Sequence, residues 1–220
     1  MRGGNKVAGE ADNQQGSRNG VSKTLFLTPQ RLRAELLAAS ALDLECYLQG
    51  ALRDGTRSAL HGTHRIGQAD PRWLKVIEIA LSHLGYRSWT YREGQDREFW
   101  IVETTASFLS VSFDASNLVE TRNGLAYVRG YFDAEGGMPR DPKARLYFQF
   151  SQKDLENLSV VRRILEFEGI DCGRIHNPSY RVDPHYWRFF VLSKSHERFM
   201  ELIRSWHPRK RQQIETRMKI

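Results

Sequence analysis

Hydrophobic and polar residues follow one pattern twice along this chain. Residues 66–86 and 150–170 align without a gap when the sequence is shifted by 84 positions. In both segments the pattern predicts the end of a strand, an aspartate that can cap a helix, an amphipathic helix and a glycine that ends it. The matched residues are Gln68 with Gln152, Asp70 with Asp154, and Gly85 with Gly169. Since three residue types recur at one offset, we interpret the chain as an internal repeat.

An apolar run that ends in an acid and a glycine precedes each repeat unit. The runs are CYLQGALRDGT at 46–56 and YVRGYFDAEGG at 127–137, so that Asp54 corresponds to Glu135. Their periodicity predicts helices. An acid in the last turn of a helix faces the negative end of the helix dipole, which costs roughly 0.3–1 kcal/mol. The recurrence of this unfavourable placement indicates a function for the two acids.

Segments that predict strands surround the second helix of each copy. Before that helix there is room for a hairpin at 56–68 and at 137–152. After it, strands are predicted at 86–93 and 97–104 in the first copy, and at 171–177 and 185–193 in the second. A closing helix is predicted at 104–113 and at 195–206. The fold class is therefore α+β, with an αββαββα unit duplicated in tandem.

The same pattern divides the chain. We expect a tail at 1–22, an N-terminal half at 23–113, a polar linker at 114–123 and a C-terminal half at 124–220. The tail is rich in Gly, Asn and Gln and has almost no large apolar side chains, which predicts disorder.

Small residues recur at four-residue intervals on both acidic helices. The two series are Ala126, Gly130 and Ala134, and Cys46, Gly50 and Asp54. Such a stripe allows another helix to approach closely, so we expect the two helices to pack as a pseudo-twofold pair. Their carboxylates would then meet, and they would repel each other unless a cation lay between them. A hard divalent ion with oxygen ligands, Mg²⁺ above all, fits this arrangement.

Composition sets wider limits. The chain has 220 residues, 40% of them hydrophobic, which suffices for one compact domain or two small fused ones. A net charge of +7 favours an anionic partner. The only cysteines, Cys46 and Cys172, exclude a disulfide framework and indicate a reducing compartment. We expect an intracellular protein, in the cytoplasm, with the nucleoid or in an organelle. No stretch is long and apolar enough to span a bilayer.

The second acidic run resembles the LAGLIDADG motif. The matching positions are Gly130, Asp133, Ala134, Glu135 and Gly136. The first run resembles a weaker copy, and the resemblance covers roughly residues 44–220. This family consists of homing endonucleases, in which two antiparallel four-stranded sheets form a saddle over DNA with the motif helices between them. The resemblance implies a monomer with internal pseudo-twofold symmetry. It also implies intron homing, with both strands of a long, near-asymmetric duplex site cut to leave short 3′ overhangs.

Metal-binding residues are also implied by the resemblance. Asp54 and Glu135 would hold the cation, together with the adjoining Gly55 and Gly136. The implied cation is Mg²⁺, with Mn²⁺ as a substitute, and Ca²⁺ is expected to bind without supporting cleavage.

Three further residues would support catalysis. Gln68 and Gln152 are implied to order water near the scissile phosphates. The family often has a basic residue after the last helix of each half, for which the second half offers Lys210 or Arg211; we assign Lys210 to the catalytic set. We interpret Asp133 as a motif acid that binds no metal.

The first motif departs from the family pattern. When it is anchored on Asp54, Gln49 stands where a glycine is expected, and Gly50 fits only if one residue is deleted. Leu52 and Arg53 replace acidic and small residues. No basic residue at 104–123 matches Lys210, so we expect the first half to pack imperfectly or to be a weaker catalyst.

Strand alternation suggests which residues contact DNA. In ARLYFQFSQ (144–152), Leu146, Phe148 and Phe150 are expected to face the helices and the intervening polar residues to face DNA. The first-half candidates are His61, Thr63, Arg65, Ser88, Thr90 and Arg92. The second-half candidates are Arg145, Tyr147, Gln149, Ser151, Arg174, His176, Tyr186 and Arg188, with Lys210 and Arg211 on flanking phosphates. Simple solvation is the alternative for each of them.

Two other functions stay open. A LAGLIDADG protein that has lost cleavage could act as an RNA maturase or as a DNA-binding regulator, which the irregular first motif favours and the two retained acids oppose. A fragment of an intein is the other alternative, although residue 1 is not a splicing nucleophile and the terminus has no His-Asn pair.

Overall fold

The computed structural model describes residues 29–94 and 98–218. The tail predicted at 1–22 lies outside these residues. In the first half the elements are α1 (Pro29–Ala38), α2 (Ala41–Ala51), the 3₁₀ turn η1 (Leu52–Asp54), β1 (Gly55–Arg57), β2 (His64–Gln68), α3 (Pro71–His83), β3 (Ser88–Arg92) and β4 (Trp100–Thr104).

The second half repeats much of this order. Its elements are α4 (Gly124–Glu135), β5 (Gln149–Gln152), α5 (Leu155–Phe167), β6 (Trp187–Phe190), the 3₁₀ turn η3 (Ser193–Ser195), α6 (His196–Ile203) and α7 (Pro208–Arg217). The predicted linker contains the 3₁₀ turn η2 (Ser116–Leu118). The division into halves at the predicted boundaries stays a prediction.

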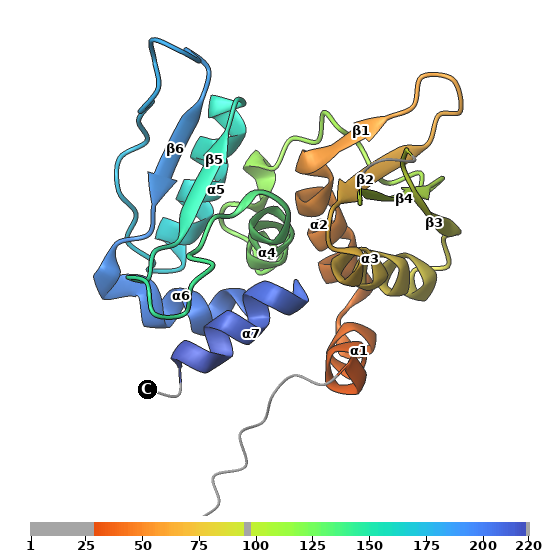
Figure 1. Cartoon of the computed structure of the whole chain (residues 1–220), viewed down its shortest axis with the longest axis horizontal. Coiled ribbons are helices and arrows are strands. Elements are labelled where there is room, and N and C mark those ends of the chain that lie inside the picture. Colours follow the sequence, from red (N-terminus) through yellow and green to blue (C-terminus); the bar gives the residue numbers. More distant parts are fainter. Residues whose placement is uncertain (1–28, 95–97, 219–220) are drawn as a thin grey trace, which may run out of the picture.

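The two motif helices lie at the centre of the molecule. Figure 1 shows α2 beside α4, with a sheet on either side and with α6 and α7 across one end. The first sheet is antiparallel in the order β1-β2-β4-β3, and the second pairs β5 with β6, also antiparallel. The α+β fold class with antiparallel sheets is thus confirmed.

Each sheet buries one face against a helix. Ile66 and Val102 lie opposite each other on β2 and β4 and pack with α3 in one core. Phe150 and Phe189 stack across the second sheet at a centroid distance of 5.1 Å, within the other core. As the alternation predicted, Phe148 and Phe150 are fully buried whereas Tyr147 is exposed.

The predicted closing helix at 104–113 is wrong. Turns follow β4 here, with hydrogen bonds from the amides of Leu109 and Phe113 to carbonyls three residues earlier. The side chain of Ser110 accepts from the amide of Ser112, a local bond that competes with helix formation. The second closing helix is confirmed as α6, which Arg204 ends in a left-handed conformation with φ 44°.

The outer segments of the second sheet make single bridges instead of continuous strands. Gly137 bridges to Gln149, and His176 bridges to Arg188. Prolines break up these segments, and because proline has no amide hydrogen it cannot complete a strand ladder. The prolines are Pro139, Pro142, Pro178 and Pro184.

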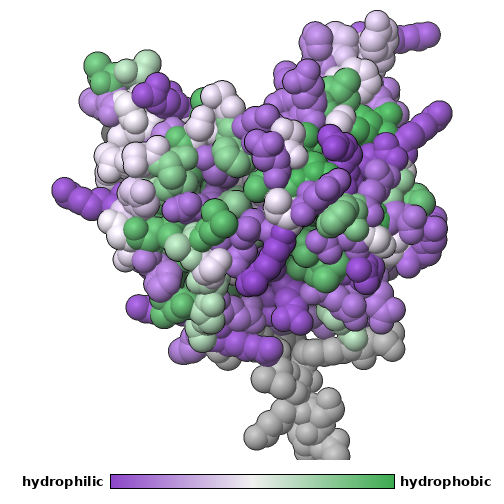
Figure 2. Space-filling model, turned by 180° about the vertical axis from the view of Figure 1, so that it is seen from behind, coloured by the Kyte–Doolittle hydropathy of each residue, from purple (hydrophilic) through white to green (hydrophobic). Residues whose placement is uncertain are grey.

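In the described part of the chain no helix is long and apolar enough to cross a bilayer. On the face seen from behind, hydrophilic residues separate the hydrophobic ones into several small groups (Figure 2).

Candidate active site

Two glycines allow α2 and α4 to touch along their backbones. A Cβ atom on Gly50 would lie closer than 3.0 Å to backbone atoms of Tyr127, and one on Gly130 would lie equally close to the backbone of Tyr47. Real Cβ atoms essentially never come so close. The reciprocal contact makes Gly50, not Gln49, the partner of Gly130. The first motif therefore does not pack imperfectly at this position.

The 3₁₀ turn η1 compensates for the residue that the first motif lacks. Asp54 lies four positions after Gly50, whereas Glu135 lies five positions after Gly130. A 3₁₀ helix rises about 2.0 Å per residue and an α-helix about 1.5 Å. Three residues of η1 thus advance the chain by as much as four residues of α4. Both acids reach the end of the helix pair.

Each acid accepts a hydrogen bond from a glutamine of the neighbouring strand. The amide of Gln68 donates to Asp54 at 3.1 Å, and the amide of Gln152 donates to Glu135 at 3.3 Å. Burial, and after it the negative charge of Asp54, raise the pKa of Glu135 from 4.5 to about 7. The effect of the Asp54 charge on Glu135 indicates that the two carboxyls lie near each other.

Asp54 lies at the more open edge of that site. Its residue surface is exposed, whereas Glu135 is half-buried. Protein atoms still crowd the carboxyl of Asp54 enough to raise its pKa from 3.8 to about 6, while Lys210 and Gln68 act in the opposite direction. In both acids the surrounding protein thus disfavours the ionised carboxylate.

Lys210 lies under the end of α4. It is 2% exposed, and its ammonium donates to the carbonyls of Phe132, Asp133 (3.0 Å) and Gly136 (2.7 Å). An ammonium has three N–H donors, so all are used. Burial lowers its pKa to about 8, and its charge lowers the pKa of Asp54 and Glu135. Lys210 thus offsets the helix dipole that makes an acid unfavourable here.

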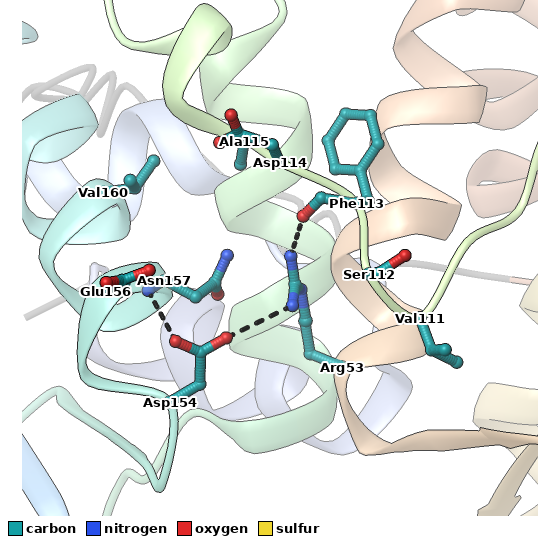
Figure 3. Close-up of a pocket in the computed structure, with 10 residues that line it drawn as sticks. All are labelled: Arg53, Val111, Ser112, Phe113, Asp114, Ala115, Asp154, Glu156, Asn157 and Val160. Atoms are coloured by element: carbon teal, nitrogen blue, oxygen red, sulfur yellow. Dashed lines mark hydrogen bonds and ion pairs between the residues drawn. The ribbon is translucent and has the colours of Figure 1, made fainter.

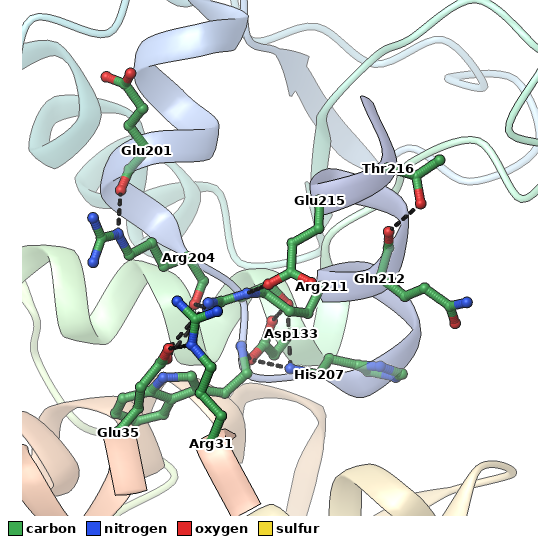
Figure 4. A network of polar contacts seen from close by, with 12 residues as sticks. Arg31, Glu35, Asp133, Glu201, Arg204, His207, Arg211, Gln212, Glu215 and Thr216 are labelled. Carbon is green, nitrogen blue, oxygen red and sulfur yellow. Dashed lines mark hydrogen bonds and ion pairs between the residues drawn. The ribbon is translucent and has the colours of Figure 1, made fainter. Parts of the chain in front are cut away.

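The predicted DNA contacts of Lys210 and Arg211 are wrong, because both side chains are buried. Arg211 is 7% exposed and pairs with Glu35 of α1 at 3.1 Å and with Glu215 at 2.7 Å. Figure 4 shows this pairing where α1 meets α7. These bonds hold the last helix against the first half.

The carboxylate of Asp133 uses its hydrogen bonds to hold the second half together. Its carboxylate accepts from the hydroxyls of Tyr47 (3.0 Å) and Ser205, and from the amides of Trp206 (2.9 Å) and His207 (3.0 Å). Burial raises its pKa, although Lys210 and these donors oppose the effect. Figure 4 shows Asp133 beside His207, the residue before α7. Asp133 thus holds α4 to the start of α7.

Arg53 plays the matching part in the first half, and sequence reasoning missed it. Its guanidinium donates to the hydroxyl of Tyr127 at 2.9 Å. It also donates to the carbonyl of Phe113 and lies 3.5 Å from the carboxylate of Asp154 (Figure 3). Arg53, Phe113 and Asp154 line a pocket of about 230 Å³. The signal that could have found it is the offset of 80 between Gly50 and Gly130, which aligns Arg53 with Asp133.

The donor set suits a hard divalent cation. No cluster of three or more His, Cys, Asp or Glu side chains that could hold a metal occurs within residues 29–94 and 98–218. Two carboxylates remain, and Mg²⁺ commonly binds to one or two carboxylates and keeps substrate phosphate and water as its other ligands. Of the implied carbonyl ligands, that of Gly136 already accepts from Lys210, which leaves one lone pair.

The model of the LAGLIDADG-like domain family matches residues 123–204. Residues 123–204 are thus similar to a LAGLIDADG-like domain. The resemblance seen in the sequence is confirmed, and the matched residues fall in the half with the regular motif. No curated protein sequence matches the chain.

Solved LAGLIDADG structures share the fold of 74% to 87% of the chain. I-DmoI in complex with DNA and Mn superposes with a TM-score of 0.56 at 16% identity, covering 74% of this chain and 97% of that one. The N-terminal LAGLIDADG domain of DUF199/WhiA gives 0.58 at 18% identity, covering 81% and 94%. Full-length DUF199/WhiA from Thermatoga maritima gives 0.60 at 16% identity, covering 87% and 66%. At these identities the likeness concerns the fold.

The outer face of the first sheet carries charges of both signs. Arg65 lies opposite Glu103, which lies opposite Trp89, so the three share this face. Arg65 pairs with Glu93 at 2.8 Å and donates to Tyr91 at 3.1 Å. The guanidinium of Arg65 on this face is thus already paired with a carboxylate.

The face assigned to three first-half candidates is wrong. Ser88, Thr90 and Arg92 share the inner face, and Thr90 donates to Glu78 of α3 at 2.6 Å. The exposed Trp89 takes the outer face instead, because the buried Val102 opposite Thr90 fixes the register. Of the remaining first-half candidates, Thr63 is buried against Glu103, whereas His61 is exposed in the hairpin turn.

The second sheet presents a basic and aromatic outer face. Arg188 lies opposite Ser151, bridges to His176, and stands over the ring of Phe190 at 5.4 Å. Gln149 lies opposite Phe190, whose ring meets that of Tyr147 at 6.1 Å. Arg145 and Arg174 are exposed nearby in the sequence, and Tyr186 is half-buried. The second-half candidates Tyr147, Gln149, Ser151, His176 and Arg188 therefore come together on one surface.

Proposed function

We propose that this protein is a site-specific DNA endonuclease that hydrolyses both strands of a long, near-asymmetric duplex target and leaves short 3′ overhangs. The observation that carries the proposal is the meeting of Asp54 and Glu135 at the ends of two helices packed backbone to backbone. Crowding raises the pKa of both carboxyls. A fold that keeps two repelling acids together is suited to holding a cation between them.

The residues that would hold Mg²⁺ are Asp54 and Glu135, with the carbonyls of Gly55 and Gly136. Mn²⁺ is the substitute, and Ca²⁺ is expected to bind without cleavage; I-DmoI structures with DNA and Mn, and with DNA and Ca, support divalent cations as partners of this fold. When bound, the ion supplies an activated water and stabilises charge on the phosphate.

Side chains of the protein itself would orient water and hold the two acids in place. Gln68 and Gln152 each fix one oxygen of an acid through an amide N–H group. The amide oxygen of Gln152 accepts from the backbone amide of Lys153 at 2.8 Å, so one lone pair of that oxygen is left to orient water. Lys210 keeps a positive charge beneath the two acids. With its donors used by carbonyls, it acts through its field and not by direct contact with phosphate.

The charge distribution supports DNA as the partner and the second half as the stronger binder. Residues 29–113 contain ten basic and ten acidic residues, whereas residues 114–220 contain nineteen and fourteen. Phosphate neutralisation dominates the affinity of proteins for DNA. We therefore assign most phosphate contacts to the second half, and base contacts to both outer sheet faces. Two free cysteines support an intracellular site of action, and the pseudo-twofold fold supports a monomer.

Cleavage of a randomised duplex library tests the proposal. The wild type should cut one sequence in Mg²⁺, bind it without cutting in Ca²⁺, and lose cutting in the double variant Asp54→Asn/Glu135→Gln. The double variant Asp141→Asn/Glu201→Gln changes two exposed acids in the same way and should cut normally. Cuts that persist in the first double variant would refute the assignment of the site.

A DNA-binding regulator or RNA maturase without cleavage is the second candidate. The observation in its favour is that Lys210 has no free donor, while residues 105–121 of the first half contain no Lys or Arg. Sequence-selective binding without cuts in the same library would select it.

A further inference from the structure

The two acids of the site are held in different ways. The end of α4 that carries Glu135 is fixed by the four bonds of Asp133 and by Lys210 on its last carbonyls. The first motif has Leu52 and Arg53 in place of such groups. After Asp54 the chain enters β1, so the placement of this acid depends on what holds η1.

Arg53 is the group in η1 that reaches out of the first half. Its side chain is 11% exposed and contacts three segments beyond β4. It donates to Tyr127 of α4, donates to the carbonyl of Phe113, and faces the carboxylate of Asp154 at 3.5 Å. Asp154 in turn caps α5 by accepting from the amide of Asn157 at 3.0 Å.

The contacts of Arg53 repeat those of Asp133 with the charge reversed. Each reaches a tyrosine of the opposite motif helix: Asp133 contacts Tyr47 and Arg53 contacts Tyr127. Each tyrosine also accepts a bond from the equivalent position of the following helix, Trp73 for Tyr47 and Asn157 for Tyr127.

The loops that close each half match this reversal. Amides of Trp206 and His207 point at the anion Asp133, and the carbonyl of Phe113 points at the cation Arg53. An anion accepts where the loop offers N–H groups, and a cation donates where the loop offers oxygen. Arg53 therefore replaces, in the first motif, the acid that Asp133 provides in the second, and the contact between the halves is kept.

We propose that Arg53 is a positioning residue that sets the place of the Asp54 carboxylate through Asp154 and Tyr127 of the other half. The inference rests on the proposed nuclease function. We assign the cutting of one DNA strand to each acid, because the two acids end different motif helices. The strand assigned to Asp54 is therefore cut more slowly when this contact between the halves is lost. Glu135, held by Asp133 and Lys210, does not depend on it.

The variant Arg53→Met tests this, because it keeps the apolar stem and removes the fork. The matched control is Arg72→Met: Arg72 pairs at 2.6 Å with Asp70, the helix cap equivalent to Asp154, but lies outside the motif. Supercoiled plasmid with one target site separates the first nick from the second. Binding measured in Ca²⁺ reports affinity without cleavage.

Arg53→Met should bind DNA within about twofold of the wild type and accumulate nicked plasmid. The second cut should slow about ten- to a hundredfold, the range expected for a displaced catalytic group. Sequencing should find the same strand intact in every nicked molecule. Arg53→Lys, which keeps the charge but not the fork, should recover only part of the rate. Equal slowing of both cuts, or normal cutting, would overturn the inference.

Amide hydrogen exchange separates failure of this inference from failure of the proposed function. If the wild type does not cut any duplex, the nuclease proposal fails. Exchange at residues 52–55 should still rise at least about tenfold in Arg53→Met, with residues 132–136 and the Arg72→Met control unchanged. Unchanged exchange at 52–55 would refute the positioning role, whatever the enzyme assay gives.

Discussion

Glu135→Gln should make the metal-free protein more stable at pH 8 while it abolishes cleavage. Burial and the charge of Asp54 raise the pKa of Glu135 from 4.5 to about 7. One pKa unit corresponds to about 1.4 kcal/mol, so the full difference would destabilise the fold by about 3 kcal/mol at high pH. Because the side chain is only half-buried, solvent screening leaves about 1.5 kcal/mol.

The sign of the pH dependence follows from the raised pKa. Below pH 4.5 the carboxyl of Glu135 is protonated in the folded and unfolded states, so wild type and variant differ little. As the pH rises towards about 7, the unfolded chain releases its proton first, and the wild-type fold loses stability relative to the variant. Above pH 7 the whole difference is present.

Thermal unfolding in a chelator between pH 4.5 and 8 measures this difference. For a chain of this size about 1.5 kcal/mol corresponds to a Tm about 3–6 °C higher for Glu135→Gln at pH 8, with no increase at pH 4.5. Glu201→Gln makes the same change on the exposed side of α6 and should leave Tm unchanged. Ca²⁺ should then raise the Tm of the wild type but not that of Glu135→Gln. A Glu135→Gln protein that is less stable at pH 8, or a gain independent of pH, would refute the crowded-carboxylate site.

Three other changes have defined outcomes. Gly130→Ala should destabilise the fold by about 3 kcal/mol or more in denaturant unfolding, because its Cβ meets backbone; normal stability would contradict the helix contact. The rate of cleavage should rise from pH 6 to 8 as both acids ionise. Because the charge of Lys210 lowers the pKa of both carboxyls, Lys210→Met should move this pH profile to higher pH. A profile that does not move would exclude the field effect of Lys210. Arg188→Ala should lower the slope of log affinity against log salt by about 0.9, whereas Arg65→Ala, already paired with Glu93, should change it less; equal slopes would contradict the assignment of phosphate contacts to the second half.

Features that repeat at short range could be predicted from the sequence. The offset of 84 residues identified both amphipathic helices and their aspartate caps, which the structure places at Asp70 and Asp154. Alternation placed Phe148 and Phe150 in the core. The paired motifs brought Asp54 and Glu135 to one place, since small residues at four-residue intervals allow two helices to meet.

Prediction failed where a residue's partner is distant in the chain. Thr90 was assigned to the DNA face, but the side chain of Glu78 and the register with β4 turn it inward. Lys210 and Arg211 were assigned to flanking phosphates, yet Lys210 is bonded to carbonyls 74 to 78 residues away and Arg211 to Glu35, 176 residues away. A charge run has the same pattern whether water or a buried acid surrounds it.

The sequence by itself determined the duplicated α+β fold and the pair of acids, because periodicity and spacing are properties of neighbouring residues. Only the tertiary structure decided that Gly50 is the contact glycine, since the shorter first motif becomes equivalent through a 3₁₀ turn. The tertiary structure also gave Arg53 contacts that are equivalent to those of Asp133. Whether an arginine in a motif is a defect or a substitute depends on the groups that face it across the helix pair, and packing alone brings those groups together.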